Sequence, residues 1–381
     1  MRTNFFMPLF AATAWLVAPL PVFAQSGGSN SIFAPSAVVE DAGSSDYSLK
    51  ESAVGAPSDK TAQGAVSPAY SLSGSGFTGQ RSAQEVIKTA PVPANGAPIK
   101  TNGGVFYYPS AFAGIGYNDN VLGTATNKTH SSFINVSPEI VAEMKNHGDR
   151  YTASFSGNVT DYFSSHDDNY ANYEAWLAGD NYFSQRARTG WKLGYITGTD
   201  ARGSTQRAIA NRPDHWSAPS FDGTFIYGAP SAAGRVEGDL KYLSKRYDNN
   251  RAQTSVADLN QAEAAGRFYY RIGTRSMLLA EVRDTEYHYT SPQPNDSNTE
   301  RRYYVGLTWE ATAATTGTVK VGRMTKDFTD SSRQGFSGGS WEAGVRWLPV
   351  DRSAVDFQSS KATADPVGYG NYQINTANSV T

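Results

Sequence analysis

The stretch YTASFSGNVTDYF, residues 151–163, decides the fold class. Tyr151, Ala153, Phe155, Gly157 and Val159 alternate with positions that hold only Thr, Ser or Asn. Successive side chains of a strand point to opposite faces of a sheet, whereas a helix repeats every 3.6 residues. The stretch therefore predicts a long strand with one apolar and one polar face.

The same alternation recurs from Val105 onward, in segments of about ten to thirteen residues. Residues 235–242, 302–310 and 339–349 set apolar side chains against charged ones. Aromatic residues gather near the ends of these segments, as in the interfacial girdles of membrane barrels. The segments also exceed the usual length of about 5–6 residues for strands of globular proteins. A soluble sandwich would alternate too, but these two features favour a membrane barrel.

The connections between the segments alternate between short and long, and barrels place short turns in the periplasm and long loops outside. The long ones include residues 121–130, 199–216 and 248–257, and the short ones include 146–149 and 272–275. We therefore predict an all-β fold for residues 103–381, a transmembrane antiparallel up-and-down β-barrel with about 14 strands visible. The last segment lacks the terminal aromatic residue usual in such barrels. We accordingly expect a truncated barrel with 16 or more strands in full.

Residues 1–24 predict a cleaved signal peptide, with Arg2, an apolar run and the end Val22-Phe23-Ala24. Residues 25–102 are rich in Ser, Ala, Gly and Pro, and predict a disordered periplasmic linker. The chain has no Cys, which excludes a lipid-anchored lipoprotein and a thiol nucleophile. The net charge of -2 gives no electrostatic case for a nucleic-acid partner.

The parity of each predicted strand assigns charged side chains to the inner face of the barrel. An Arg or Lys on the lipid face would cost about 2–4 kcal/mol near the midplane. We expect a hydrated lumen with both signs of charge, and these residues as the lining of a substrate path: Glu237, Asp239, Lys241, Glu263, Arg267, Glu281, Arg283, Arg302, Glu310, Lys320, Glu342, Arg346 and Asp356. Inward aromatic residues, such as Trp176, Tyr269 and Tyr304, offer either stacking faces for sugars or packing surfaces for loops.

Catalytic chemistry has weak candidates. The five His residues have no metalloprotease spacing, and His166-Asp167-Asp168 and Asp214-His215 are the only acid–histidine neighbours. Both resemble ordinary polar loop sequence. We therefore predict no catalytic residue, no metal site and no cofactor.

Short motifs mark the first strands of the predicted barrel: Gly116, Tyr117, Asn118, Asp119, Asn120 and Val121, then Val136, Ser137 and Pro138. With Asp161-Tyr162-Phe163 and Arg186-Ala187-Arg188, they resemble the β-barrel porin family of exopolysaccharide-biosynthesis operons, the EpsL-like group. The resemblance runs from Val105 to the C-terminus and implies a barrel associated with polysaccharide secretion. The C-terminal strands that we expect beyond this sequence are its departure from the family's pattern.

The sequence thus predicts a Gram-negative outer-membrane channel associated with export of an exopolysaccharide or another surface polysaccharide. Three alternatives stay open: a general or oligosaccharide-uptake porin, a structural or adhesive barrel, and an outer-membrane enzyme. The expected partners are outer-membrane lipid and lipopolysaccharide, the barrel-assembly machinery, periplasmic polysaccharide-secretion proteins and the polysaccharide itself.

Overall fold

The protein is described here by a computed structural model, which describes residues 99–101, 103–124, 126–202, 210–229, 231–292, 296–312, 315–350, 353–364 and 373–380. The predicted signal peptide lies outside the described residues, as does nearly all of the predicted linker. Both assignments therefore stay predictions.

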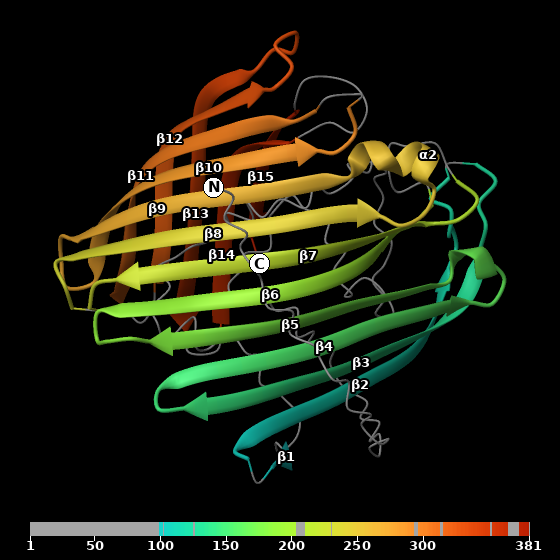
Figure 1. Ribbon diagram of the computed structural model, residues 1–381, viewed down its shortest axis with the longest axis horizontal. Coiled ribbons are helices and arrows are strands. Elements are labelled where there is room, and N and C mark those ends of the chain that lie inside the picture. The colour runs from blue at the N-terminus through green and yellow to red at the C-terminus, as the bar shows by residue number, and fades with distance from the viewer. Residues whose placement is uncertain are drawn as a thin grey trace, which may run out of the picture.

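Fifteen strands within these ranges form one antiparallel sheet, in which each strand pairs with its neighbours in chain order (Figure 1). They are β1 (Ile99–Lys100), β2 (Val105–Asn118), β3 (Ser131–Asn146), β4 (Asp149–Tyr162), β5 (Tyr170–Tyr182), β6 (Ala187–Asp200), β7 (Asp214–Tyr227), β8 (Gly234–Tyr247), β9 (Leu259–Arg271), β10 (Ser276–Tyr289), β11 (Asn298–Thr312), β12 (Thr315–Phe328), β13 (Phe336–Val350), β14 (Ser353–Ala364) and β15 (Gln373–Val380). The all-β, antiparallel, up-and-down class is confirmed. The two-residue strand β1 falls inside the segment predicted as linker.

Short and long connections alternate strictly along the sheet, as the sequence predicts. Between β3 and β4 only His147 and Gly148 intervene, with φ angles of 49° and 104°. Two successive positive φ angles match the two-residue hairpin turn that follows the twist of its strands, and Gly148 adopts its angle without steric cost. The opposite end carries longer connections, such as the one that holds the short helices α2 (Arg251–Thr254) and η3 (Ser255–Ala257) (Figure 1).

The connection predicted at residues 199–216 is shorter than expected at both ends. β6 continues to Asp200 and β7 begins at Asp214, and these two residues face each other across the ladder. The backbone ladder needs no apolar alternation, so it extends beyond the segment that the side-chain pattern marks. Residues 203–209 lie outside the described part of the chain.

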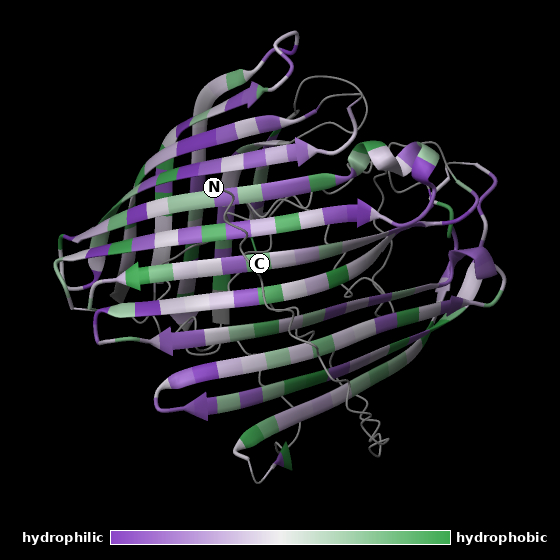
Figure 2. Ribbon diagram, viewed as in Figure 1, coloured by the Kyte–Doolittle hydropathy of each residue, from purple (hydrophilic) through white to green (hydrophobic). Residues whose placement is uncertain are grey.

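The two faces of the sheet differ sharply in exposure. On β8, Val236 is 50% exposed and Leu240 61%, whereas Glu237 is 2% and Asp239 5% exposed. Figure 2 shows the resulting alternation of hydrophobic and hydrophilic bands along many of the strands. Apolar side chains that point outward and polar side chains that point inward are the arrangement of a barrel in lipid.

The sheet curves, and its last strands, coloured orange to red, pass behind the front strands (Figure 1). Among the described residues, β1 pairs only with β2 and β15 only with β14, so the sheet is not closed. The described part of the chain holds no helix long and apolar enough to cross a membrane.

Candidate functional site

A band of ionised side chains covers the inner face of six consecutive strands, β8 to β13. Apart from Lys241, none is more than 6% exposed. We call it the charged wall, and it consists of Arg235, Glu237, Asp239, Lys241, Glu263, Arg267, Glu281, Arg283, Glu300, Arg302, Lys320 and Glu342.

Arg267 is the centre of the wall's first half. Its Nη1 lies 3.2 Å from Glu237 Oε2, its Nε lies 3.4 Å from Glu281 Oε2, and its Nη2 contacts Asp239. Arg235 Nη2 adds an ion pair with Glu237 Oε1 at 2.9 Å. One guanidinium on β9 therefore joins carboxylates from β8 and β10.

Glu342 is the centre of the second half. Its Oε1 lies 3.0 Å from Arg283 Nη1 and 3.4 Å from Arg302 Nη1, and its Oε2 lies 2.5 Å from Lys320 Nζ. Lys320 also reaches Glu281 Oε2 at 2.9 Å, which links the two halves. Side chains from β10 and β13 are three strands apart and meet here because the sheet is concave on this side.

The sequence analysis expected hydrated charges in the lumen, but most charges of the wall are buried in mutual ion pairs. The strand register explains this difference. Glu237 faces Arg267, Arg267 faces Glu281, and opposite charges at paired positions attract. Parity alone identifies the face of a residue, whereas burial depends on what the neighbouring strands place beside it.

Four of the predicted lining residues stand apart from the wall's core. Lys241 pairs with Glu263 at 3.3 Å, and its side chain is 18% exposed. Arg346 and Asp356 form a two-point contact of 2.8 and 2.9 Å on β13 and β14, but both are partly exposed. Glu310 belongs to β11, and its side chain lies outside the described part of the structure.

The inner face of β3 and β4 carries mostly amide and hydroxyl groups, with an ion pair of 3.2 Å between Arg150 and Glu143 near the short turn. Asn135 Nδ2 donates to Asn158 Oδ1 at 3.0 Å and contacts Thr160 Oγ1 at 2.8 Å. Ser137 Oγ donates to Asn135 Oδ1 at 3.0 Å. The inner surface is therefore uneven, with amide and hydroxyl groups on one sector and paired charges on the other.

Cations lie over the three inward aromatic rings considered as sugar platforms. Arg235 lies 4.4 Å from the Tyr269 centroid, Lys320 lies 5.1 Å from the Tyr304 centroid, and Lys192 lies 5.0 Å from the Trp176 centroid. These contacts are cation–π interactions. They occupy ring faces that a sugar would need for stacking.

Sequence reasoning missed several inward charges, among them Glu300, Arg235 and Arg188. Glu300 shares the parity of Arg302, but the predicted strand began at residue 302, whereas β11 begins at Asn298. Arg235 shows the same alternation as Glu237 and was left out of the predicted lining. Arg188 was assigned to a turn motif, but it lies on β6 and is 8% exposed.

The family-motif residues shape the end of the first hairpin. A Cβ at Gly116 would overlap the ring of Phe133 on β3, so a larger residue cannot replace this glycine without rearrangement. Asn118 Oδ1 accepts a hydrogen bond from the backbone N–H of Asn120 at 2.9 Å. The side-chain amide of Asn120 in turn donates to the carbonyl oxygen of Thr124 and accepts from its backbone N–H. Tyr117 and Asp119 are exposed beside them.

Pro138 interrupts the ladder between β3 and β4, where the paired positions on β3 pass directly from Val136 to Glu139. Proline has no backbone N–H to donate to a ladder. These motif residues are therefore structural in this fold.

The acid–histidine candidates occupy the long-connection end. Asp168 Oδ1 accepts a hydrogen bond from Arg202 Nε at 2.7 Å, and this bond raises the pKa of Arg202 above its ordinary value. Asp214 accepts Asn250 Nδ2 at 2.7 Å, and His215 Nδ1 lies 2.9 Å from Thr199 Oγ1. Within the described residues, no three His, Asp or Glu side chains group as metal ligands.

An up-and-down sheet with an apolar outer face, a charged inner face and one end of short turns defines the β-barrel membrane proteins. Residues 95–371 match the family described as putative beta-barrel porin 2, and the chain belongs to that family. A comparison with curated proteins found no match.

Proposed function

We propose that the protein is an outer-membrane channel that serves the export of an exopolysaccharide or another surface polysaccharide. The main support for a channel is that the two faces of the sheet differ in polarity: apolar Leu240 faces outward and charged Asp239 faces inward. The porin family supports it. The resemblance to the porins of exopolysaccharide operons supports the substrate class.

Conductance tests the channel part of the proposal. The refolded full chain in a planar lipid bilayer should give discrete conductance steps. The single variants Arg346→Gln and Asp356→Asn each remove one charge of the exposed pair. Each should shift ion selectivity, because charges along a pore set the potential that a passing ion meets. A protein that inserts but never conducts would contradict the channel.

Secretion tests the substrate part. Deletion of the gene should reduce surface polysaccharide, and the wild-type gene should restore it. An unchanged polysaccharide level, together with reduced uptake of oligosaccharides, would favour an uptake porin. Partner proteins in the periplasm would then be those of nutrient uptake.

A structural barrel is the second candidate, and the burial of the charged wall favours it. Ion pairs such as Arg283 with Glu342 neutralise the inner face and stiffen it. This candidate predicts no conductance in the bilayer experiment, so the same measurement separates the two.

We also propose that the protein is not an enzyme. Asp168 is held by Arg202, and Asp214 by Asn250, which leaves neither free to orient a histidine. Replacing His166 and His215 with Ala should leave secretion close to wild type. Loss of secretion in a variant that reaches the outer membrane would support an enzyme instead.

A further inference from the structure

The side chain of Arg188 carries a buried charge that forms no ion pair with the charged wall. Arg188 lies on the inner face of β6, close to the short-turn end, and is 8% exposed. Its Nε and Nη2 have no hydrogen-bond partner within the described residues. Arginine stays protonated in proteins, and a buried charge without a partner is strongly unfavourable. In the part of the chain that the structure describes, Arg188 therefore has no carboxylate in direct contact.

A second guanidinium lies close to Arg188. Arg235 on β8 is 3% exposed, and its charge repels that of Arg188, whereas Glu237 attracts it without forming an ion pair. Arg235 Nε also lacks a partner among the described residues, as does the hydroxyl of Tyr269, whose ring lies beneath Arg235. Three groups that can donate hydrogen bonds are thus unsatisfied in the same part of the inner face.

The nearby carboxylates on β8 are already engaged. Glu237 is shared by Arg235 and Arg267, and Asp239 contacts Arg267. The register places Arg188, Ile226 and Glu237 in one row across β6, β7 and β8. Arg188 is therefore an excess positive charge at the edge of an otherwise paired wall.

We propose that Arg188 and Arg235 bind a carboxylate of an acidic sugar residue in the exported polymer. The planar guanidinium donates two parallel hydrogen bonds to a carboxylate, and a charged acceptor makes these bonds short and strong. The Tyr269 hydroxyl adds a third donor. This inference rests on the proposed function. It places the site at the short-turn end, the periplasmic end of a barrel, where an exported polymer enters.

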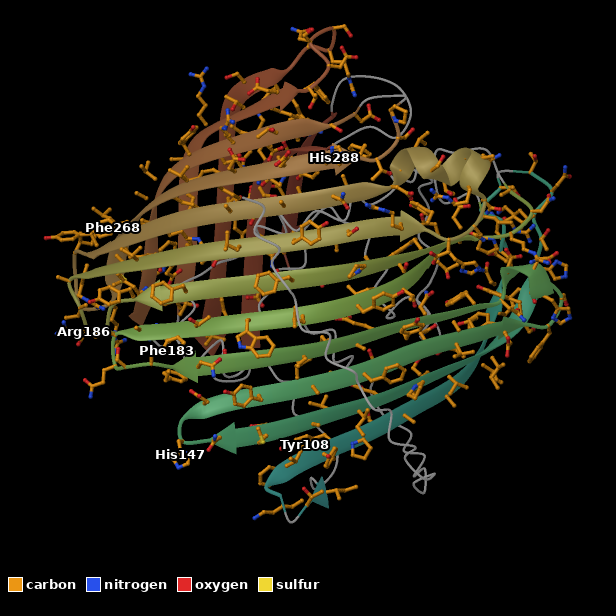
Figure 3. The ribbon with its side chains drawn as sticks, viewed as in Figure 1. Tyr108, His147, Phe183, Arg186, Phe268 and His288 are labelled. Atoms are coloured by element: carbon orange, nitrogen blue, oxygen red, sulfur yellow. The ribbon has the colours of Figure 1, made fainter. Side chains whose placement is uncertain are left out.

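Calorimetric titration of the refolded full chain in detergent with trigalacturonate tests the proposal. Maltotriose is the neutral comparison, and inorganic phosphate is the free-oxyanion comparison. Wild type should bind trigalacturonate and not maltotriose, and Arg188→Gln should weaken binding at least about tenfold. Arg186→Gln is the matched control, because Arg186 lies exposed in the adjacent turn and should bind as wild type (Figure 3).

Stability gives an independent readout. Without ligand, Arg188→Gln should unfold at a higher denaturant concentration than wild type, because the variant removes an uncompensated charge. Arg188→Lys keeps the charge but loses the two parallel donors of the guanidinium, so its affinity for trigalacturonate should lie between those of wild type and Arg188→Gln. This variant replaces Arg188→Gln if that protein misfolds. Equal binding by wild type and Arg188→Gln, equal binding of maltotriose, or binding of phosphate alone would overturn the proposal.

The outcomes separate this inference from the proposed function. Trigalacturonate binding that depends on Arg188, in a protein that neither conducts nor supports secretion, would support the site and contradict the channel. Conductance and secretion without such binding would support the channel and overturn the site.

Discussion

Glu342 shows how one residue holds several strands together. It is the shared acceptor of Arg283, Arg302 and Lys320. Glu342→Gln would leave three buried cations with less compensation, so we expect a loss of about 3–5 kcal/mol in the free energy of unfolding. Denaturant unfolding of the refolded protein in lipid vesicles, followed by tryptophan fluorescence, measures this loss.

Asp356→Asn is the control for that variant. It breaks the contact with Arg346, in which both side chains are partly exposed, and exposed pairs contribute up to about 1 kcal/mol. A Glu342→Gln variant that is no less stable than Asp356→Asn would show that the charged wall adds nothing to stability.

At the scale of single residues, the sequence predicts the inward direction of the charges but not their burial. The parity of Glu237 and Leu240 is visible in the printed sequence. The pairing of Glu281 with Lys320 joins two residues that are 39 positions apart in the sequence, which no local pattern encodes. The unneutralised Arg188 is likewise visible only once the register is known.

On a single strand, the two faces should respond oppositely to mutation. Leu240 is 61% exposed on the outer face of β8. Leu240→Arg should reduce the amount of folded protein in the outer membrane, because Arg at the lipid-facing midplane costs about 2–4 kcal/mol. Leu240→Ala keeps the site apolar and should assemble almost normally. The heat-modifiable fraction on gels measures both, and equal assembly of the two variants would place this face away from lipid.

The connection between β6 and β7 predicts the topology of the barrel. A peptide tag inserted at Gly203 should be labelled on intact cells, because long loops of outer-membrane barrels face outward. The same tag between Gly273 and Thr274, in the short connection from β9 to β10, should be labelled only after the membrane is permeabilised. The reverse pattern would mean that the orientation is inverted.

Strand existence and connection lengths follow from local chemistry, which explains why the sequence predicts them well. The hairpin at His147-Gly148 lies between two alternating segments, and both strands are present. Strand ends were less predictable, as β6 and β7 show, since backbone pairing continues past the last apolar position. The two-residue β1 has no side-chain alternation and was not predicted.

At the scale of the whole molecule, a deletion in the predicted linker tests whether the chain divides into a linker and a separately folding barrel. Deleting residues 25–94 should leave a barrel that folds and shows heat-modifiable migration, because the segment is too poor in apolar residues to form a core. Gel migration of membrane extracts measures assembly, and the polysaccharide assay reports any separate loss of secretion. A deletion variant that fails to assemble in the membrane would show that the segment belongs to the folded unit.

The strict chain order of the sheet makes the hairpin the natural unit of change in this protein. Each pair of strands joined by a short turn forms backbone ladders only with the hairpins before and after it in the sheet. Duplication or loss of one hairpin would therefore widen or narrow the molecule by two strands and leave the remaining ladders in register. Evolution can adjust the bore of such a protein in discrete steps, while the outer surface keeps the same composition.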